Sequence, residues 1–381
     1  MNSVIPIENN DVLSALRGFL RKLMESDLVD ALLVPLETGD GLVQPALVSD
    51  PSLLEVANPL LPIMPINNAR AMSALTGKHA PARIGAVLRP CEIRALVELV
   101  KLQQTSLEDV LLIGLDCPGT YELPESMALG ACNGENRSDN LTTYLSAAHD
   151  GKEAEIKDLP LRPACQMCIH PVPENVDIHI HLFGADSTVV LALTLKDELA
   201  AKLQLTEAPA GEAWNPEQGR ETAGRIIAGR KQVREKELGA IRTRMTSNGG
   251  IAGLFAACIR CHNCMTACPI CYCKTCLFKT TSFDHEPAYY LNAARRKGAQ
   301  RMLGDTLLFQ MTRLNHMSAS CVSCGMCTSA CPSDIPVGAI FSAIGEHVQA
   351  AFEYTPGKDV NEPLPLITFQ PHEWNEVGEE K

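Results

Sequence analysis

Two cysteine-rich runs carry the strongest chemical signal in the chain. Residues 258–276 read CIRCHNCMTACPICYCKTC, and residues 321–332 read CVSCGMCTSACP. Both contain the spacing C-x2-C-x2-C-x3-C-P, in which three thiolates bind one iron–sulfur cubane and the fourth binds a neighbouring cubane. The repeated spacing therefore predicts two 4Fe-4S clusters in this part of the chain.

Each predicted cluster takes three thiolates from one run and a fourth from the other. The ligands of the first are Cys258, Cys261, Cys264 and Cys331, and those of the second are Cys321, Cys324, Cys327 and Cys268. Zinc is the competing metal, but zinc sites usually combine two separated cysteine pairs. Cysteines this close in sequence are also poorly placed to form disulfides with one another.

Three further cysteines of the first run, Cys271, Cys273 and Cys276, are not needed for those eight ligand positions. Their spacing, C-x-C-x2-C, matches neither a complete cubane run nor an ordinary zinc site. Two interpretations stay open: the three thiols shield a cluster as small buried residues, or one of them replaces Cys268 as a ligand. His262 and Met265 are expected to pack around the clusters without binding iron.

The first half of the chain offers a third set of thiols, namely Cys91, Cys117, Cys132, Cys165 and Cys168. We expect four of them, Cys91, Cys117, Cys165 and Cys168, to bind another 4Fe-4S cluster, with Cys132 as the alternate. Cys91 and Cys117 each follow a predicted strand, and parallel neighbouring strands present such residues at one edge of a sheet. The competing interpretation is that only the pair Cys165 and Cys168 matters, or that this pair binds zinc.

The elements that position these thiols follow from the hydrophobic pattern. Residues 84–88 and 110–115 are short, apolar predicted strands, and Pro90 suits the first turn of a helix. Residues 176–182 alternate apolar and polar side chains, which is typical of a half-exposed strand, so His179 and His181 are expected to be surface residues. The segment 220–244 carries eight Lys or Arg against three Glu and is interpreted as a basic helix with a solvated face.

These signals divide the chain into four predicted parts. Residues 1–210 form an α/β domain with a mixed sheet and a cysteine-bound cluster, and residues 211–250 form a basic helical connector. Residues 251–360 form a mainly α-helical, two-cluster ferredoxin-like domain, and residues 361–381 form a polar, acidic tail.

Composition limits the classes of partner. The net charge of -12 argues against nucleic acid and anionic lipid, both of which are negatively charged. No apolar run approaches the roughly 18 residues that cross a bilayer, and the start MNSVIPIENN lacks the basic residues of a secretory signal. We therefore expect a cytoplasmic protein without membrane insertion. We find no Walker loop, no G-x-G-x-x-G after a strand and no Ser-His-Asp arrangement in the sequence. A classical dinucleotide-binding fold is therefore not supported.

The motifs resemble those of a known family. RIGAVLRPCEIRALVELVKLQ, IGLDCPGTY, and RPACQMC with VDIHIHLFG are similar to the beta subunits shared by deazaflavin-reducing hydrogenases and formate dehydrogenases. The C-terminal cysteine runs look like the two-cluster ferredoxin module fused to many bacterial members. The resemblance implies an N-terminal cluster, with Cys91, Cys117, Cys165 and Cys168 at the matching positions, and in some members an FAD that exchanges hydride with the deazaflavin.

Two functions from different classes remain under consideration. The first is an electron-transfer subunit with three 4Fe-4S clusters in a multi-subunit oxidoreductase, whose partner is a formate dehydrogenase, hydrogenase or heterodisulfide-reductase-like subunit. The second is an FAD-containing reductase or dehydrogenase that exchanges hydride with a deazaflavin or nicotinamide coenzyme. A deazaflavin or a ferredoxin is a candidate small partner, and whether the chain alone is an enzyme is left open. A redox sensor is disfavoured because no DNA-binding motif is present.

Overall fold

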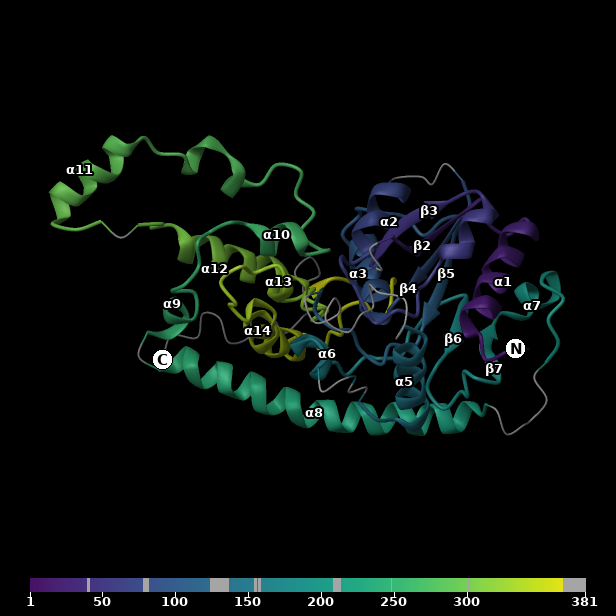
Figure 1. Cartoon of the computed structure of the whole chain (residues 1–381). Helices are drawn as coiled ribbons and strands as arrows, with labels where there is room; N and C mark the ends of the chain where they lie inside the picture. Colours follow the sequence, from purple (N-terminus) through teal and green to yellow (C-terminus); the bar gives the residue numbers. More distant parts are fainter. Residues whose placement is uncertain are drawn as a thin grey trace. The chain divides into compact units, whose positions relative to one another are not determined.

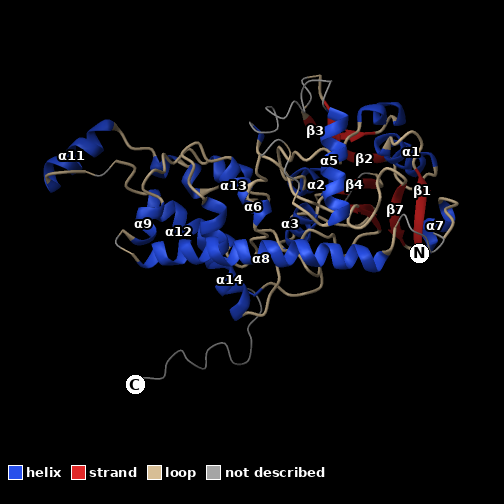
Figure 2. Cartoon of the chain, turned by 60° about the horizontal axis from the view of Figure 1, so that its bottom comes forward, coloured by secondary structure: helices blue, strands red, loops and turns tan. Residues whose placement is uncertain are grey.

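A computed structural model describes residues 1–39, 42–77, 82–123, 137–153, 156, 159–207, 214–247, 249–300 and 302–365. The described chain separates into two compact units. Unit 1 contains residues 1–236 together with the short segments 322–325 and 356–363, and unit 2 contains residues 237–321, 326–355 and 364–381. Every described strand lies in unit 1. Figure 2 colours these strands red.

Unit 1 is built on one mixed sheet of seven strands in the order β1-β7-β6-β5-β4-β2-β3. The strands are β1 (Asn2–Pro6), β2 (Ala31–Glu37), β3 (Val43–Val48), β4 (Ile84–Leu88), β5 (Val110–Leu115), β6 (Ile178–His181) and β7 (Val190–Leu195). The four central strands, β2, β4, β5 and β6, are parallel, and the β1, β3 and β7 pairings are antiparallel. The predicted mixed sheet is therefore confirmed (Figure 1).

Helices join and cover these strands. They are α1 (Val12–Glu25), η1 (Pro51–Val56), α2 (Ala69–Thr76), α3 (Pro90–Lys101), α5 (Arg137–Asp150), α6 (Pro163–Gln166) and α7 (Asp197–Lys202). The carboxylate of Asp11 begins α1 by accepting a hydrogen bond from the N–H of Ser14 at 2.9 Å, and Pro90 occupies the first turn of α3 as predicted.

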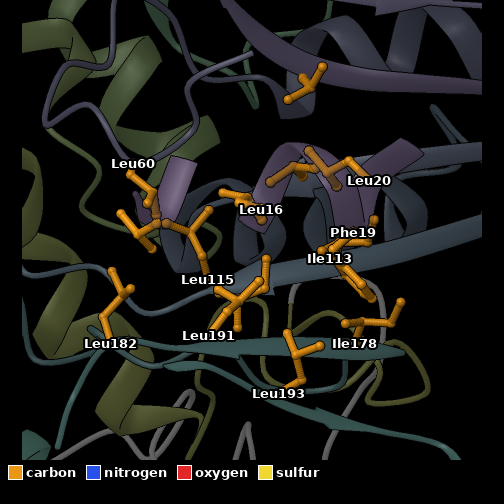
Figure 3. Packing of buried hydrophobic residues seen from close by; sticks show 14 of the residues in the cluster. Leu16, Phe19, Leu20, Leu60, Ile113, Leu115, Ile178, Leu182, Leu191 and Leu193 are labelled. Carbon is orange, nitrogen blue, oxygen red and sulfur yellow. The ribbon is translucent and has the colours of Figure 1, made fainter. Parts of the chain in front are cut away.

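The core of unit 1 lies between α1 and the sheet. Leu16, Phe19 and Leu20 of α1 belong to the same buried cluster as Ile113 of β5 and Leu193 of β7 (Figure 3). Strand β4 is buried at all five positions, which explains its unbroken apolar sequence IGAVL. This rigid sheet fixes the ends of β4 and β5, after which Cys91 and Cys117 follow.

Unit 2 is helical in its described part and rich in cysteine. Its helices are α9 (Gly250–Leu254), α10 (Asn263–Ala267), η2 (Leu277–Lys279), η3 (Thr281–Phe283), α11 (Pro287–Lys297), α12 (Thr306–Met317), α13 (Met326–Ser329) and α14 (Val337–Ala351). Residues 220–244, predicted to be helical, lie within the single helix α8 (Pro216–Thr246), which begins in unit 1 and ends in unit 2. Within the described residues, no helix is both long and apolar enough to cross a membrane.

Candidate metal centres

Strands β4 and β5 bring Cys91 and Cys117 to the same edge of the sheet. The two strands are parallel neighbours from Ile84 paired with Val110 to Leu88 paired with Gly114, as the sequence predicts. Cys91 is the second residue of α3, and Cys117 lies two residues beyond β5. Both thiols therefore follow the carboxyl ends of adjacent strands, where open α/β sheets usually bind their ligands.

Cys165 and Cys168 are held next to the chain that follows Cys117. The N–H of Arg162 donates to the carbonyl oxygen of Thr120 at 2.8 Å, which fixes the start of α6 against this loop. The N–H and the hydroxyl oxygen of Thr120 each lie 3.4 Å from the Cys165 sulfur. The N–H of Cys117 in turn donates to the carbonyl of Pro171 at 2.8 Å, just beyond Cys168.

The four thiols influence one another electrostatically. Burial raises the pKa of Cys91, and negative charge at Cys324, Glu92, Cys117 and Cys168 raises it further. Burial also raises the pKa of Cys168, whereas Arg230 lowers it and Cys165 and Cys117 raise it. Such coupling requires the thiols to be close together, so the structure gathers the four preferred cysteines in one region. Cys132, the alternate, lies outside the described residues.

A fifth thiol in this region, Cys324, was not expected from the sequence. It belongs to the segment 322–325 of unit 1, and its carbonyl oxygen accepts a hydrogen bond from Arg162 Nη2 at 3.2 Å. Gly325 has a φ of +74°, and a Cβ there would lie 2.2 Å from the Cβ of Ala164, so only glycine permits this approach. No sequence spacing relates Cys324 to Cys91, because more than two hundred residues separate them.

Three buried arginines surround the thiols of unit 1. Arg89 Nη1 lies 3.6 Å from the Cys117 sulfur, and its Nη2 donates to the carbonyls of Pro59 and Leu61 at 3.2 and 2.6 Å. Arg162 is 2% exposed. Arg230 of α8 is also 2% exposed and donates to Glu153 at 2.7 Å and to the carbonyl of Pro118. The expectation of a solvated basic helix is therefore wrong at Arg230, because α8 packs this guanidinium against the cysteine loops.

Unit 2 gathers the first predicted set of cubane ligands. Burial raises the pKa of Cys264, which Arg313 lowers and negative charge at Cys258, Cys261 and Cys331 raises. Arg313 is 4% exposed, and its Nη1 and Nη2 donate to the sulfur and the carbonyl oxygen of Cys264 at 3.1 and 3.2 Å. The structure thus brings three thiols of one run close to the last cysteine of the other.

The second predicted set of cubane ligands is divided between the two units. Cys268, Cys321 and Cys327 belong to unit 2, whereas Cys324 belongs to the short segment of unit 1. The Cys268 sulfur lies 4.0 Å from the Met317 sulfur of α12. Iron binding by this set stays a prediction.

Met265 is buried and the ring of His262 packs 4.7 Å from that of Phe309, which agrees with their expected packing roles.

The remaining cysteines of the first run are not a buried shield. Cys273 is exposed, and Cys271 and Cys276 are only half-buried. The Cys276 sulfur lies 3.6 Å from the sulfur of Met265. The shielding interpretation is wrong for Cys273, because the loop after Cys268 carries this residue to the surface.

The histidines of β6 are not surface residues. His179 Nε2 and Asp116 Oδ1 lie 2.8 Å apart, and His181 Nε2 lies 2.8 Å from the hydroxyl of Thr194 on β7. Burial, together with a smaller effect of the charge on His179, lowers the pKa of His181 to about 3, although Asp116 acts in the opposite direction. The surface expectation fails because β6 is an interior strand and Trp214, far along the sequence, packs its ring 4.7 Å from that of His181.

Comparisons with known proteins match the C-terminal cysteine-rich segment and most of the chain. Residues 254–335 match the family model described as a 4Fe-4S dicluster domain. The chain is 25% identical over 380 residues to the F420-dependent formate dehydrogenase subunit beta of Methanocaldococcus jannaschii, which covers 93% of this chain and 94% of that protein. It is 26% identical over 307 residues to the F420-dependent formate dehydrogenase 1 subunit beta of Methanococcus maripaludis, covering 75% and 76%.

A solved chain is more distantly similar. It comes from the F420-reducing NiFe hydrogenase complex of Methanosarcina barkeri and aligns at 13% identity with a TM-score of 0.42, covering 63% of this chain and 92% of that chain. This likeness is too low to establish a common fold. The similarity to formate dehydrogenase beta subunits, together with the dicluster domain, confirms the family resemblance that the motifs indicate over nearly the whole chain.

Proposed function

We propose that the chain is an iron–sulfur electron-transfer subunit of a cytoplasmic, multi-subunit oxidoreductase. It would carry three 4Fe-4S clusters and pass single electrons to or from a catalytic subunit. The relatives named as beta subunits of formate dehydrogenases favour a formate dehydrogenase as that partner. The dicluster domain at residues 254–335 supports cluster binding in unit 2.

The donor set of unit 1 fits a cluster with four thiolate ligands. Burial and negative charge at neighbouring thiols raise the pKa of Cys91 and of Cys168, which is the cost of placing several thiolates close together. Arg89 and Arg230 offset this repulsion with buried positive charge. A bound 4Fe-4S cluster would supply one-electron chemistry at this edge of the sheet.

For the two ferredoxin-type clusters we assign the cubane ligands as the sequence spacing predicts. Cys258, Cys261, Cys264 and Cys331 would hold one cluster, and Cys321, Cys324, Cys327 and Cys268 the other. Arg313 and Gln310 would orient the first of these sets, since Arg313 donates to the Cys264 sulfur at 3.1 Å and Gln310 Nε2 to the Cys258 sulfur at 3.5 Å.

The observation that carries the relay is the position of Cys324. Its carbonyl oxygen accepts a hydrogen bond from Arg162 Nη2 at 3.2 Å, and a Cβ on the next residue, Gly325, would lie 2.2 Å from the Cβ of Ala164, which precedes Cys165. Cys324 is a predicted ligand of a ferredoxin-type cluster, and Cys165 is a predicted ligand of the sheet-edge cluster. Neighbouring ligands of two different clusters give electrons a short path between them, which is the property that a relay subunit needs.

The test is the iron and flavin content of anaerobically purified protein. About 12 irons per chain without flavin supports three clusters, since each cubane holds about four. A content of about eight irons per chain would contradict the assignment of a cluster at the sheet edge.

The variant Cys165→Ser locates that cluster. We expect it to lose about four irons and one spectroscopic signal while the ferredoxin-type pair remains. Cys273→Ser is the matched control, because Cys273 is exposed and is not an assigned ligand. Retention of all iron by Cys165→Ser would contradict the assignment.

A flavin-containing reductase is the second candidate, favoured by the size of one cavity. Unit 1 contains a cavity of about 930 Å³ between the start of α1, α5 and the loop before β7, and cofactor sites commonly reach such volumes. Its described lining includes the carboxylates of Asp11, Glu37 and Asp186 and, among these described residues, one arginine, Arg17, which lies 3.7 Å from Glu37. These charges do not fit the pyrophosphate of FAD. Bound flavin with hydride-transfer activity would nevertheless favour this candidate over the relay.

A further inference from the structure

A carboxylate and two imidazoles come together beside the cysteine site of unit 1. Asp116 follows β5, and His179 and His181 project from one face of β6 because they are two residues apart on a strand. One ligating atom from each of the three side chains lies within 4.8 Å of the other two. The motifs IGLDCPGTY and VDIHIHLFG carry these residues, and neither the clusters nor the relay uses them.

The carboxylate of Asp116 is held in a fixed orientation. Its Oδ2 accepts hydrogen bonds from the backbone N–H groups of Leu182 and Phe183 at 2.9 and 3.1 Å. Its Oδ1 points instead to His179 Nε2 at 2.8 Å. Asp116 is 2% exposed, so one oxygen is anchored by the backbone and the other is presented to the imidazoles in a buried setting.

The imidazoles are oriented as well. Their ring centroids lie 3.8 Å apart, and His181 Nε2 contacts the hydroxyl of Thr194, which donates to Asn2 Oδ1 at 2.8 Å. Hydrogen bonds of this kind typically fix the tautomer and direction of histidines that bind metals. Four strands, β5, β6, β7 and β1, therefore contribute to one polar cluster.

A second observation indicates that a group is expected next to this cluster. The indole Nε1 of Trp214 is buried and has no hydrogen-bond partner among the described residues. Trp214 is 6% exposed, and its ring lies 4.7 Å from the ring of His181. A buried donor without a partner is costly, by about 1–3 kcal/mol. A water or hydroxide bound to a metal ion held by the neighbouring imidazoles would be an acceptor for it.

We propose that Asp116, His179 and His181 bind one divalent first-row transition ion, separate from the cysteine-bound clusters. Two imidazoles and one carboxylate are the ligand set of sites for Fe²⁺, and they also suit Mn²⁺ and Zn²⁺. The ion takes the place of the hydrogen between His179 and Asp116, and Asp116 keeps its two backbone contacts. The three protein ligands leave positions for water, to which Trp214 donates.

The test is titration of the anaerobic, oxidised full-length protein with Mn²⁺, followed by the loss of the free-ion EPR signal. Mn²⁺ is chosen because it prefers oxygen and nitrogen ligands to thiolates. We expect one tight site per chain, and His181→Gln weakens this site by about 100-fold or more, since even outer-shell changes cost 10- to 100-fold. Zn²⁺ displaces the bound Mn²⁺, because it stands higher in the affinity order.

The matched control is His149→Gln. His149 Nδ1 also contacts a carboxylate, that of Asp150 at 3.1 Å, but the two side chains are 36% and 40% exposed. This variant keeps the Mn²⁺ affinity of the parent. His179→Gln serves as the second test. Equal Mn²⁺ affinity in parent, His179→Gln and His181→Gln, or no tight Mn²⁺ site in the parent, overturns the proposal and leaves a hydrogen-bond network only.

Discussion

The cysteine sites of unit 1 and unit 2 are built in opposite ways. In unit 1 the four preferred thiols come from positions spread between Cys91 and Cys168, and two of them follow strands of a seven-stranded sheet. In unit 2 the thiols of one run lie within a few residues of each other, around the five-residue helix α10. One site is organised by a hydrophobic core, and the other by local spacing.

The difference concerns what holds the thiols in place. The core of unit 1 orders β4 and β5 whether or not a metal is bound, since Ile84, Val87 and Ile113 are each no more than 2% exposed. The segment between Cys258 and Cys276 contains few buried apolar residues. Short helices such as α10 are only marginally stable unless packing or a bound metal supports them. Unit 2 should therefore depend on its clusters for folding, as other small metal-bound modules do.

The largest expected effect is the response to iron removal. After chelation, amides of β4 and β5 should keep their protection against hydrogen exchange, whereas residues 258–276 should lose it. Mass spectrometry of the iron-free and iron-loaded protein measures both segments in one experiment. Equal loss of hydrogen-exchange protection in the two segments would show that the sheet edge also needs its metal. The proposed difference between the two cysteine sites would then be wrong.

The next effect tests the packing that supports Cys91. Gly357 has a φ of +74°, and a Cβ there would lie 2.4 Å from both the Cα and the carbonyl oxygen of Arg94 on α3. Gly357→Ala should lower the free energy of unfolding by about 2 kcal/mol or more, since the left-handed conformation alone costs roughly 1–2 kcal/mol. Urea denaturation of both variants provides the measurement.

Gly18→Ala is the control for that substitution. Gly18 lies on α1, with nothing within 4 Å of an added Cβ, so alanine there should stabilise the helix by up to about 1 kcal/mol. A small effect at Gly357 would mean that the segment 356–363 contributes little to the cysteine site.

The smallest expected effect is on the reduction potentials of the clusters near Arg313 and Arg89, the two arginines that approach a cysteine sulfur. Arg313 lies 3.1 Å from Cys264, and Arg89 lies 3.6 Å from Cys117. Positive hydrogen-bond donors stabilise the reduced, more negative cluster, so removing them should lower its reduction potential. A charged hydrogen bond contributes about 1.5 kcal/mol, so Arg313→Gln should shift one potential by roughly 60 mV, and Arg89→Gln should shift a different one by less.

Redox titrations monitored by EPR separate these shifts. Arg313→Lys keeps the positive charge and should recover part of the potential that Arg313→Gln loses, which a purely structural role would not predict. The same shift from both glutamine variants would indicate that distance to the sulfur does not set the size of the effect.

The sequence predicted the parts of this protein that depend on local order. The spacing C-x2-C-x2-C-x3-C-P is itself a geometric constraint, so candidate ligands such as Cys258 and Cys264 could be named without a fold. The strands of residues 84–88 and 110–115 could be named for a similar reason, because burial of short parallel strands leaves unbroken apolar runs. The parallel pairing of these strands then followed, with Cys91 and Cys117 at one edge.

Only the tertiary structure decided which distant groups meet. The Cys324 carbonyl oxygen accepts from Arg162, Arg313 donates to Cys264, and Trp214 packs on His181. All three contacts join segments far apart in sequence. Periodicity describes one element at a time, so it placed His179 and His181 on a polar face but not beneath another part of the chain. The long-range core contacts that fix these neighbours are a property of the whole fold.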